Sequence, residues 1–351
     1  PNGMPNGLQP VHAAVRGLIE AHNKVSYVGY SATPFANVLI NRGSTKDLYP
    51  RDFIIPLPKP EGYIGSDDIF GSSLIKTDEE NPIVAQIWGG EPGDMEQLAL
   101  HCRDLGYHGI DINMGCPAKK VCNVLAGSAL LQNEDLVGRI LRAVVQAVEV
   151  PVTLKTRLGW DDEHKNILTV AKMAEQAGIA ALAVHGRTRT QMYKGEAAYE
   201  LIAEVKQQIK LPLWVNGDLS SPQKAADILR QTGADGVMIG RAAQGQPWLF
   251  RDIRHYLAEG SLPPPPKFDE AAATLLEHIA EMHAFYGEIA GVRIARKHIG
   301  WYLARLPEGE SQRRELNRLE SAAEQYDTLA AFLHRQELAE WPTDYRNSAA
   351  V

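Results

Sequence analysis

Several polar side chains in this sequence directly follow short apolar segments, and their types are those that bind ligands or transfer protons. Cys116 lies between Gly115 and Pro117, which indicates a rigid, exposed loop at the end of such a segment. A thiol in that position can act as an acid or as a nucleophile. Cys122 follows, but a cysteine pair at this spacing with no further cysteine after it is a poor zinc site, so we expect no metal.

Two glycine-containing turns follow the last two apolar segments: Asn216, Gly217 and Asp218 form one, and Gly240 with Arg241 forms the other. Glycine lets backbone amides approach an anion, and arginine supplies a forked cation. These turns are therefore predicted to hold the phosphate group of a ligand. A tight turn with a surface arginine is the alternative for the second.

Lys155 and His185 belong to two further apolar segments. An ammonium group buried in a core is costly, so a ligand or a carboxylate is expected close to Lys155. His185 can be a structural histidine with its hydrogen bonds satisfied, but its place at the end of a segment favours a ligand contact.

Six apolar segments alternate with helical patterns after residue 80, which predicts parallel strands joined by helices. The strands are expected at 83–89, 109–115, 152–159, 181–187, 212–218 and 236–242. Because no Gly-x-Gly-x-x-Gly motif follows any of them, a (β/α)8 TIM barrel is favoured over a doubly wound sheet. Barrels carry their reactive residues at the carboxyl ends of the strands, where the polar residues named above fall.

A different organisation follows the barrel segments. Four consecutive prolines at 263–266 mark a domain boundary, and 269–287, 291–306 and 313–335 then show helical periodicity without a strand signal. Between residues 293 and 318, seven lysines and arginines stand against three glutamates in a chain of net charge −7. Arg293, Arg296 and Lys297 share one helix face, as contacts to phosphates require. A solvated charged face is the alternative.

Composition excludes several classes of protein. The chain has 351 residues, of which 44% are hydrophobic and 23% are charged, and no apolar run approaches the roughly 18 residues that span a bilayer. Three cysteines cannot form a disulfide framework, so a cytoplasmic location without membrane attachment is expected. The chain begins at Pro1, and we expect this not to be its natural start.

Seven segments carry a resemblance to one family. They are 112–120 (INMGCPAKK), 125–131 (LAGSALL), 151–155 (PVTLK), 185–189 (HGRTR), 216–218 (NGD), 238–250 (MIGRAAQGQPWLF) and 293–298 (RIARKH). In order and spacing they closely resemble bacterial tRNA-dihydrouridine synthases, nearest to the B-type subfamily, over about residues 75–335. The resemblance implies an FMN-dependent enzyme that uses NADPH to reduce the C5–C6 double bond of particular uridines in tRNA, and we expect it to act as a monomer.

Carried over residue by residue, the resemblance makes Cys116 the general acid that protonates uracil C5. The cofactor contacts that it implies are Gln86, Lys155, His185, Asn216, Gly217, Asp218, Gly240 and Arg241. The substrate contacts that it implies are Asn113, Arg187, Arg293, Arg296 and Lys297. Two alternatives stay open: a small-molecule flavin dehydrogenase of the dihydroorotate or dihydropyrimidine type, and a catalytically impaired, chimeric or fragmentary RNA-binding remnant.

The first part of the chain departs from this family, which opens with a flavin-contacting strand and an Ala-Pro-Met-Ala-Gly loop. Segments 25–40 and 47–71 instead resemble a fragment of a helicase-like endonuclease domain, although a phosphate-binding loop is absent, which excludes a working helicase. The predicted parts are an atypical segment at 1–75, an FMN-binding TIM-barrel catalytic domain at 76–260 and a helical tRNA-binding domain at 267–345. As a hypothesis, 25–30 and 52–57 fill the places of the two missing strands.

Overall fold

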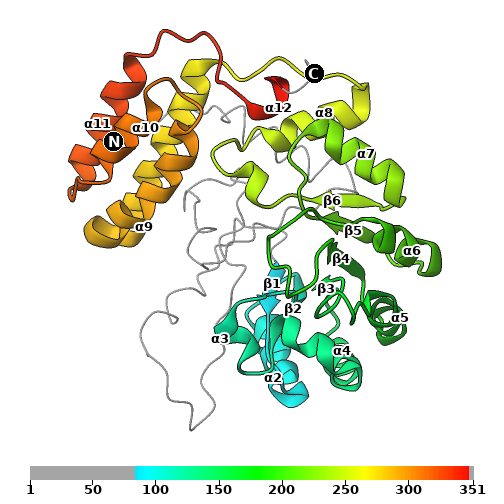
Figure 1. The fold of residues 1–351 in the computed structure, drawn as a ribbon. Helices are drawn as coiled ribbons and strands as arrows, with labels where there is room; N and C mark the ends of the chain where they lie inside the picture. Colours follow the sequence, from blue (N-terminus) through cyan, green and yellow to red (C-terminus); the bar gives the residue numbers. More distant parts are fainter. Residues whose placement is uncertain (1–83, 348–351) are drawn as a thin grey trace.

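The computed structural model describes residues 84–347 (Figure 1). Within this range, six parallel strands form one sheet whose spatial order follows the chain. They are β1 (Val84–Ile87), β2 (Gly109–Met114), β3 (Val152–Arg157), β4 (Ala181–His185), β5 (Leu213–Asn216) and β6 (Gly236–Met238). The six predicted strand and helix units are thus confirmed, although each strand ends before its predicted limit because the polar residues that follow belong to loops. The N-terminal segment and the two strands hypothesised within it lie outside the described residues.

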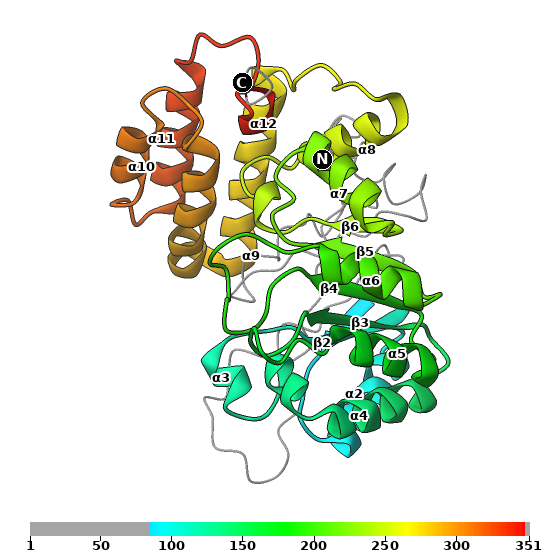
Figure 2. The ribbon, with the colours of Figure 1, turned by 45° about the vertical axis from the view of Figure 1, so that its right-hand side comes forward.

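Helices follow the strands and cover the outer side of the sheet (Figures 1 and 2). They are α2 (Pro92–Asp104), α4 (Glu134–Ala147), α5 (Ile167–Ala177), α6 (Glu200–Gln208), α7 (Pro222–Thr232) and α8 (Leu249–Glu259). Three short elements lie in loops at the carboxyl ends of strands or just after them, namely α3 (Lys119–Cys122) and the 3-10 helices η2 (Gly127–Gln132) and η3 (Arg241–Ala243).

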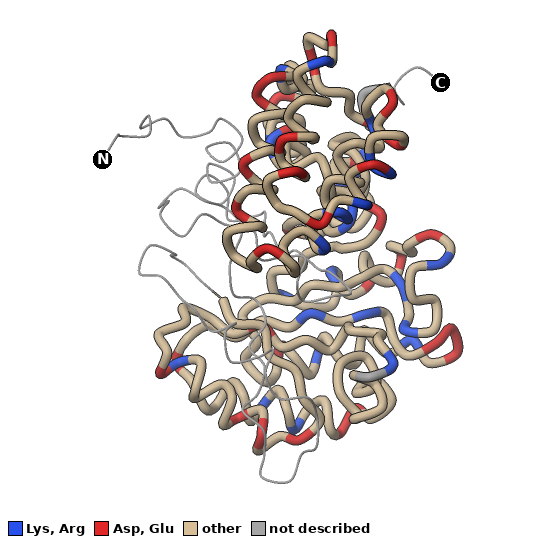
Figure 3. The backbone as a smooth tube through the Cα atoms, turned by 90° about the vertical axis from the view of Figure 1, so that its left-hand side faces the viewer, with Lys and Arg blue, Asp and Glu red and all other residues tan. Residues whose placement is uncertain are grey.

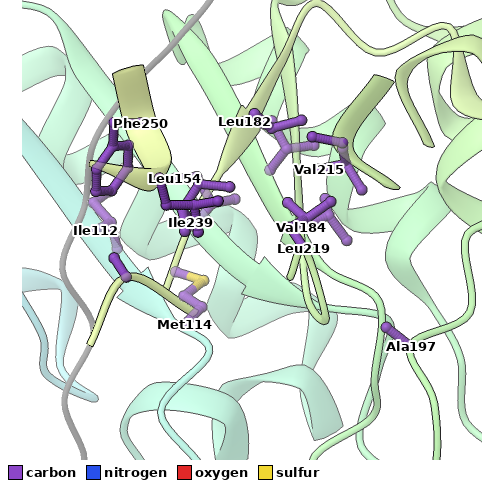
Figure 4. Close-up of a cluster of buried hydrophobic side chains, with 14 of the residues drawn as sticks. Ile112, Met114, Leu154, Leu182, Val184, Ala197, Val215, Leu219, Ile239 and Phe250 are labelled. Atoms are coloured by element: carbon purple, nitrogen blue, oxygen red, sulfur yellow. The ribbon is translucent and has the colours of Figure 1, made fainter. Parts of the chain in front are cut away.

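Alternation along β2 and β3 separates an apolar face from a polar one. Ile112 and Met114 on β2 and Leu154 on β3 belong to the core between the sheet and the helices, as Figure 4 shows. Because neighbouring residues of a strand point to opposite faces, Asn113 and Lys155 point to the inner face of the sheet. The same apolar periodicity that makes these segments strands therefore aims their polar residues at the interior of the predicted barrel.

The C-terminal part is helical, as predicted. It contains α9 (Phe268–Leu303), α10 (Gly309–Leu316), α11 (Ala322–His334) and α12 (Asp344–Asn347). The backbone of Gly287 leaves the helical conformation, with φ 74° and ψ 176°, so α9 bends where the sequence predicted two helices. The single helix predicted at 313–335 is wrong, because α10 ends at Leu316 and the Ser321 side chain caps a new helix by accepting a hydrogen bond from Glu324 N–H.

The end of the chain returns from the helical part to the barrel, where α12 lies beside α8 (Figures 1 and 2). Trp341 N–H donates to Pro266 O at 2.9 Å, and Phe268 N–H donates to Ala339 O at 3.0 Å. The Trp341 ring stacks on Phe268 at 5.2 Å and meets the edge of Trp248, in the loop before α8, at 5.8 Å. Barrel and helical part therefore share one hydrophobic core. Within residues 84–347, no helix combines the length and the apolar character needed to cross a bilayer.

Gly245 lies where the loop after η3 meets the second half of α9. Its φ is +70°, and a β carbon at this position would lie 2.4 Å from Trp301 O. Both the conformation and the contact require glycine.

We expect Gly245→Ala to lower the free energy of unfolding by about 3 kcal/mol, because strain at positive φ adds to a clash with backbone atoms. Gly260→Ala is the matched control, since Gly260 has φ +71° but nothing within 4 Å of the added carbon. It should cost only about 1 kcal/mol. Urea unfolding of both variants checks this, and equal losses would contradict the proposed close contact with α9.

Candidate functional site

The inner face of the sheet gathers predicted site residues from separate strands. Asn113 on β2 pairs in register with Lys155 on β3, and His185 on β4 pairs with Asn216 on β5. Gln86, Asn113, Lys155 and His185 are all buried. The polar residues that the sequence analysis placed at strand ends are thus brought together on one surface.

Cys116 follows β2 on a loop that is held at its backbone while the residue stays partly exposed. Its N–H donates to Asn113 Oδ1 at 3.0 Å. Its carbonyl oxygen accepts from Ser128 Oγ at 2.8 Å and from Ser128 N–H at 3.1 Å. Arg157 Nε donates to Gly115 O at 2.8 Å, which anchors the preceding residue as well. These hydrogen bonds hold the backbone of Gly115 and Cys116 at the end of β2.

Ser128 was not predicted as a member of this site, and Arg157 was expected among the polar residues at strand ends but without an assigned role. Arg157 is only 2% exposed, and its Nη1 donates to the carbonyl oxygens of Thr188 and Met192 at 3.0 and 2.9 Å. It therefore joins the Cys116 loop to the loop after β4. Its place at the end of β3 was a sequence signal for the site, but its partners lie 31 to 42 residues away in the chain.

Lys155 is 3% exposed on the inner face of β3. Burial, reinforced by the charge of Arg157, lowers the pKa of Lys155 to about 7, while the Asp111 carboxylate opposes this shift. Burial also raises the pKa of Asp111, against hydrogen bonds from Thr153 and Gln86. A carboxylate was expected near Lys155, and Asp111 on the neighbouring strand supplies one.

His185 is neutral and has a defined tautomer. Burial and the charges of Lys155, Arg157, Arg187 and Arg241 keep its pKa far below the ordinary value. Arg187 Nη1 lies 3.3 Å from His185 Nε2, and because a guanidinium group only donates, this nitrogen accepts. The ring proton is therefore on Nδ1, which leaves His185 an N–H donor on its other side.

Arg187 and Asp218 form an ion pair that shapes the next corner of the site. Arg187 is 1% exposed and donates from both terminal nitrogens to the Asp218 carboxylate at 2.9 and 2.5 Å. Although burial opposes it, these hydrogen bonds and one from Ala197 N–H lower the pKa of Asp218. The predicted substrate contact of Arg187 and cofactor contact of Asp218 stay predictions, and the geometry engages the two side chains with each other.

The predicted phosphate corner joins two loops. Gly217 has φ +115°, and a β carbon there would lie 2.9 Å from both Ala197 Cβ and His185 Cδ2. A β carbon on Gly240, in contrast, would have nothing within 4 Å. The Arg241 side chain is 54% exposed, lies 3.6 Å from Asp218 and stacks at 4.7 Å over the Tyr193 ring. Asn216 Nδ2 ties the corner to β6 by donating to Met238 O at 2.8 Å.

The three predicted cations of the helical part differ in their surroundings. Arg293 and Lys297 are exposed, and Lys297 lies over the Trp301 ring at 4.9 Å. Arg296 is less exposed and donates to Leu319 O at 2.9 Å, after the end of α10. Acidic and basic residues intermingle over the helices in Figure 3. The common helix face is present, but one of its three cations is engaged within the protein.

The residues of the inner face fit a ligand that carries negative charge. Three cationic side chains are buried there, namely Lys155, Arg157 and Arg187, and they are accompanied by two acidic ones, Asp111 and Asp218. Open space at Gly240 beside the exposed Arg241 suits the phosphate of FMN, and Lys155 suits the electron-rich edge of its ring. Among residues 84–347, His, Cys, Asp and Glu side chains form no group of three that could hold a metal ion.

Lys155 makes stability depend on pH in a defined direction. Its folded-state pKa of about 7 lies below the ordinary value of 10.5, so between these values the unfolded chain binds more protons and stability rises with pH. We therefore expect the free energy of unfolding of the cofactor-free wild type to rise between about pH 7 and about pH 9. The rise should be smaller in Lys155→Met, which lacks the titrating group.

Urea unfolding at the two pH values measures this difference. Lys210→Met, which removes an exposed lysine, controls for the loss of one positive charge and should behave like the wild type. An equal pH dependence in Lys155→Met and the wild type would contradict the assignment.

Known proteins share most of this chain. The sequence model of the Dihydrouridine synthase (Dus) family matches residues 63–337. The chain is 56% identical over 259 residues to tRNA-dihydrouridine synthase B of Pseudomonas aeruginosa, which covers 74% of this chain and 78% of that protein. It is 57% identical over 243 residues to the protein of the same name from Xanthomonas campestris, covering 69% of this chain and 73% of the relative. With the Serratia marcescens protein, identity is 51% over 259 residues, or 74% of this chain and 78% of the relative. The chain belongs to the dihydrouridine synthase family.

Proposed function

We propose that this protein reduces the C5–C6 double bond of uridines in tRNA, with FMN as its bound cofactor and NADPH as the electron donor. The observation that carries the proposal is the placement of two groups on neighbouring strands: a partly exposed thiol on a hydrogen-bonded loop after β2, and a buried lysine on β3. Family membership and relatives named tRNA-dihydrouridine synthase B support this assignment over a small-molecule flavin dehydrogenase.

The inner face of the sheet is the proposed FMN site. Gln86, Lys155 and His185 would hold the ring and the ribityl chain. The phosphate would bind at the corner made by Asn216, Gly217, Asp218, Gly240 and Arg241. When bound, the flavin supplies the hydride. Lys155 in its protonated form would stabilise negative charge on the reduced ring, and the paired Arg187 and Asp218 keep the His185 N–H in place.

Cys116 is the proposed general acid, which delivers a proton to uracil C5. An ordinary thiol is protonated at neutral pH, as this task requires. The backbone hydrogen bonds to Asn113 and Ser128 hold the thiol at the rim, where a base turned out of the tRNA can reach it. Asn113 is the proposed contact for the base, and Arg187 acts through His185.

The helical part is the proposed tRNA-binding domain, at 267–345, beside a catalytic domain at 76–260. The second half of α9 carries Arg293 and Lys297 and ends against the loop that holds Arg241. In this junction Arg305 Nη1 donates to Trp301 O at 2.7 Å and to Gln244 O at 3.5 Å. Exposed cations on that helix would contact tRNA phosphates near the mouth of the barrel. The proposed location is the cytoplasm, since tRNA is a cytoplasmic substrate. The proposed oligomeric state is a monomer.

Cys116→Ala should lower kcat for dihydrouridine formation at least about 100-fold, because the proton donor is removed. Binding of FMN should persist, since the side chain is not part of the proposed cofactor contacts. Mass spectrometry of tRNA measures the product. Absorbance near 450 nm measures the bound flavin, and we expect about one FMN per chain in the variant.

Cys102→Ala is the control for loss of a thiol, because Cys102 is fully buried in the core on α2. Full activity in Cys116→Ala would overturn its role. Reduction of free uracil, with tRNA left unmodified, would favour the small-molecule dehydrogenase instead.

Replacing both Arg293 and Lys297 by alanine should weaken tRNA binding at every salt concentration. The slope of log Kd against log salt should fall by about 2, one for each lost phosphate contact. Filter binding across a salt series measures it. Arg139→Ala with Lys165→Ala is the matched control, since each is an ion-paired cation on the barrel. The same slope in both double variants would remove the helical face from the tRNA interface.

A further inference from the structure

A chain of buried hydrogen bonds crosses the first three described strands and ends at Cys116. Thr153 Oγ1 donates to Asp111 Oδ1 at 2.7 Å, and Gln86 Nε2 donates to Asp111 Oδ2 at 2.6 Å. Asn113 Nδ2 donates to Gln86 Oε1 at 3.0 Å. Asn113 Oδ1 then accepts the N–H groups of both Gly115 and Cys116, each at 3.0 Å.

The Asp111 carboxylate determines the direction of every hydrogen bond in this chain. Both carboxylate oxygens of Asp111 accept a hydrogen bond, so Gln86 must turn its nitrogen toward Asp111 and its oxygen toward Asn113. Asn113 then meets that oxygen with its own nitrogen, which leaves its oxygen for the two backbone N–H groups. Either amide, if turned over, would place like groups against each other at a buried position. Gln86, Asp111 and Asn113 are 5%, 8% and 7% exposed, so water is a poor substitute for the missing partners.

We propose that Asp111 is a positioning residue, whose carboxylate sets the orientation of the Gln86 and Asn113 amides and thereby holds the Cys116 loop in its reactive place. The catalytic consequence rests on the proposed function of Cys116, whereas the positioning itself does not. Asp111 and Asn113 flank Ile112 on β2, so both side chains lie on the inner face of the sheet. The relay can therefore form within one short strand and its two neighbours.

Three variants separate the relay from simple loss of a buried polar group. Asp111→Leu removes the acceptor that orients Gln86, and Gln86→Met interrupts the relay while leaving Asp111 in place. Thr156→Val is the matched control, because Thr156 on the neighbouring strand β3 is a fully buried hydroxyl that donates to Met114 O outside the relay. Should Asp111→Leu fail to fold, Asp111→Asn takes its place, since its amide can present either atom to Gln86 and no longer imposes one orientation.

The first readout needs neither cofactor nor tRNA. We expect the rate of Cys116 alkylation by iodoacetamide, resolved by peptide mass spectrometry, to rise about fivefold in Asp111→Leu, because the loop loses its anchor. Gln86→Met should raise it by a similar factor, and the double variant by no more than either single one, since both act through one path. Thr156→Val should stay at the wild-type rate. In the folded variants, an unchanged alkylation rate, or single effects that multiply in the double variant, would overturn the proposal.

The second readout is the split between kcat and KM for dihydrouridine formation. Asp111→Leu should lower kcat about tenfold or more while KM for tRNA stays within about twofold, because a displaced proton donor affects chemistry and not tRNA binding. A rise in KM with kcat unchanged would overturn the positioning role. If the wild type makes no dihydrouridine, the proposed function fails, and the alkylation series still decides whether Asp111 holds the loop.

Discussion

Charged and amide side chains can be buried on the inner face of a parallel sheet only when each finds a partner of suitable charge or hydrogen-bonding type. This constraint organises the candidate site. Arg187 is satisfied by Asp218, by His185 and by the carbonyl oxygens of Lys194 and Gly195. Arg157 is satisfied by carbonyl oxygens from two loops. The loops at the carboxyl ends of the strands are therefore built around cations, and their shape depends on these contacts.

The same constraint links the thiol to the proposed cofactor site. Asn113 serves the Cys116 loop with its oxygen and the Gln86 relay with its nitrogen, so the thiol and the inner face share one hydrogen-bonded network. Lys155 is in register with Asn113 and close enough to Asp111 for the carboxylate to oppose, in part, the lowering of the Lys155 pKa by burial. A negatively charged ligand on this face would complete the balance between buried cations and anions.

The helical part is attached where the predicted phosphate corner lies. Gly245 lets the loop after η3 approach the backbone of Trp301, and Trp341 closes the junction by packing on Phe268 and Trp248. Because η3 and this contact are only a few residues apart, the orientation of the helical part and the position of Arg241 depend on the same short segment. This arrangement offers a physical route by which a bound tRNA and a bound cofactor could be placed relative to each other.

The sequence by itself determined the six strands, their order and the polar residues near their carboxyl ends, because a short apolar segment followed by polar residues is a local pattern that each strand carries alone. It also placed Cys116 on a loop at the end of a strand and identified the family. Only the tertiary structure decided which partners the polar residues take. Contacts with residues far away in the chain, and the orientation of side chains, decide what Asp111, Arg157 and Ser128 do. A local sequence pattern encodes neither the contacts nor the orientation. Arg187 and Arg296 show the same limit, since residue type indicated cations for ligands, whereas packing assigned them to Asp218 and to Leu319 O.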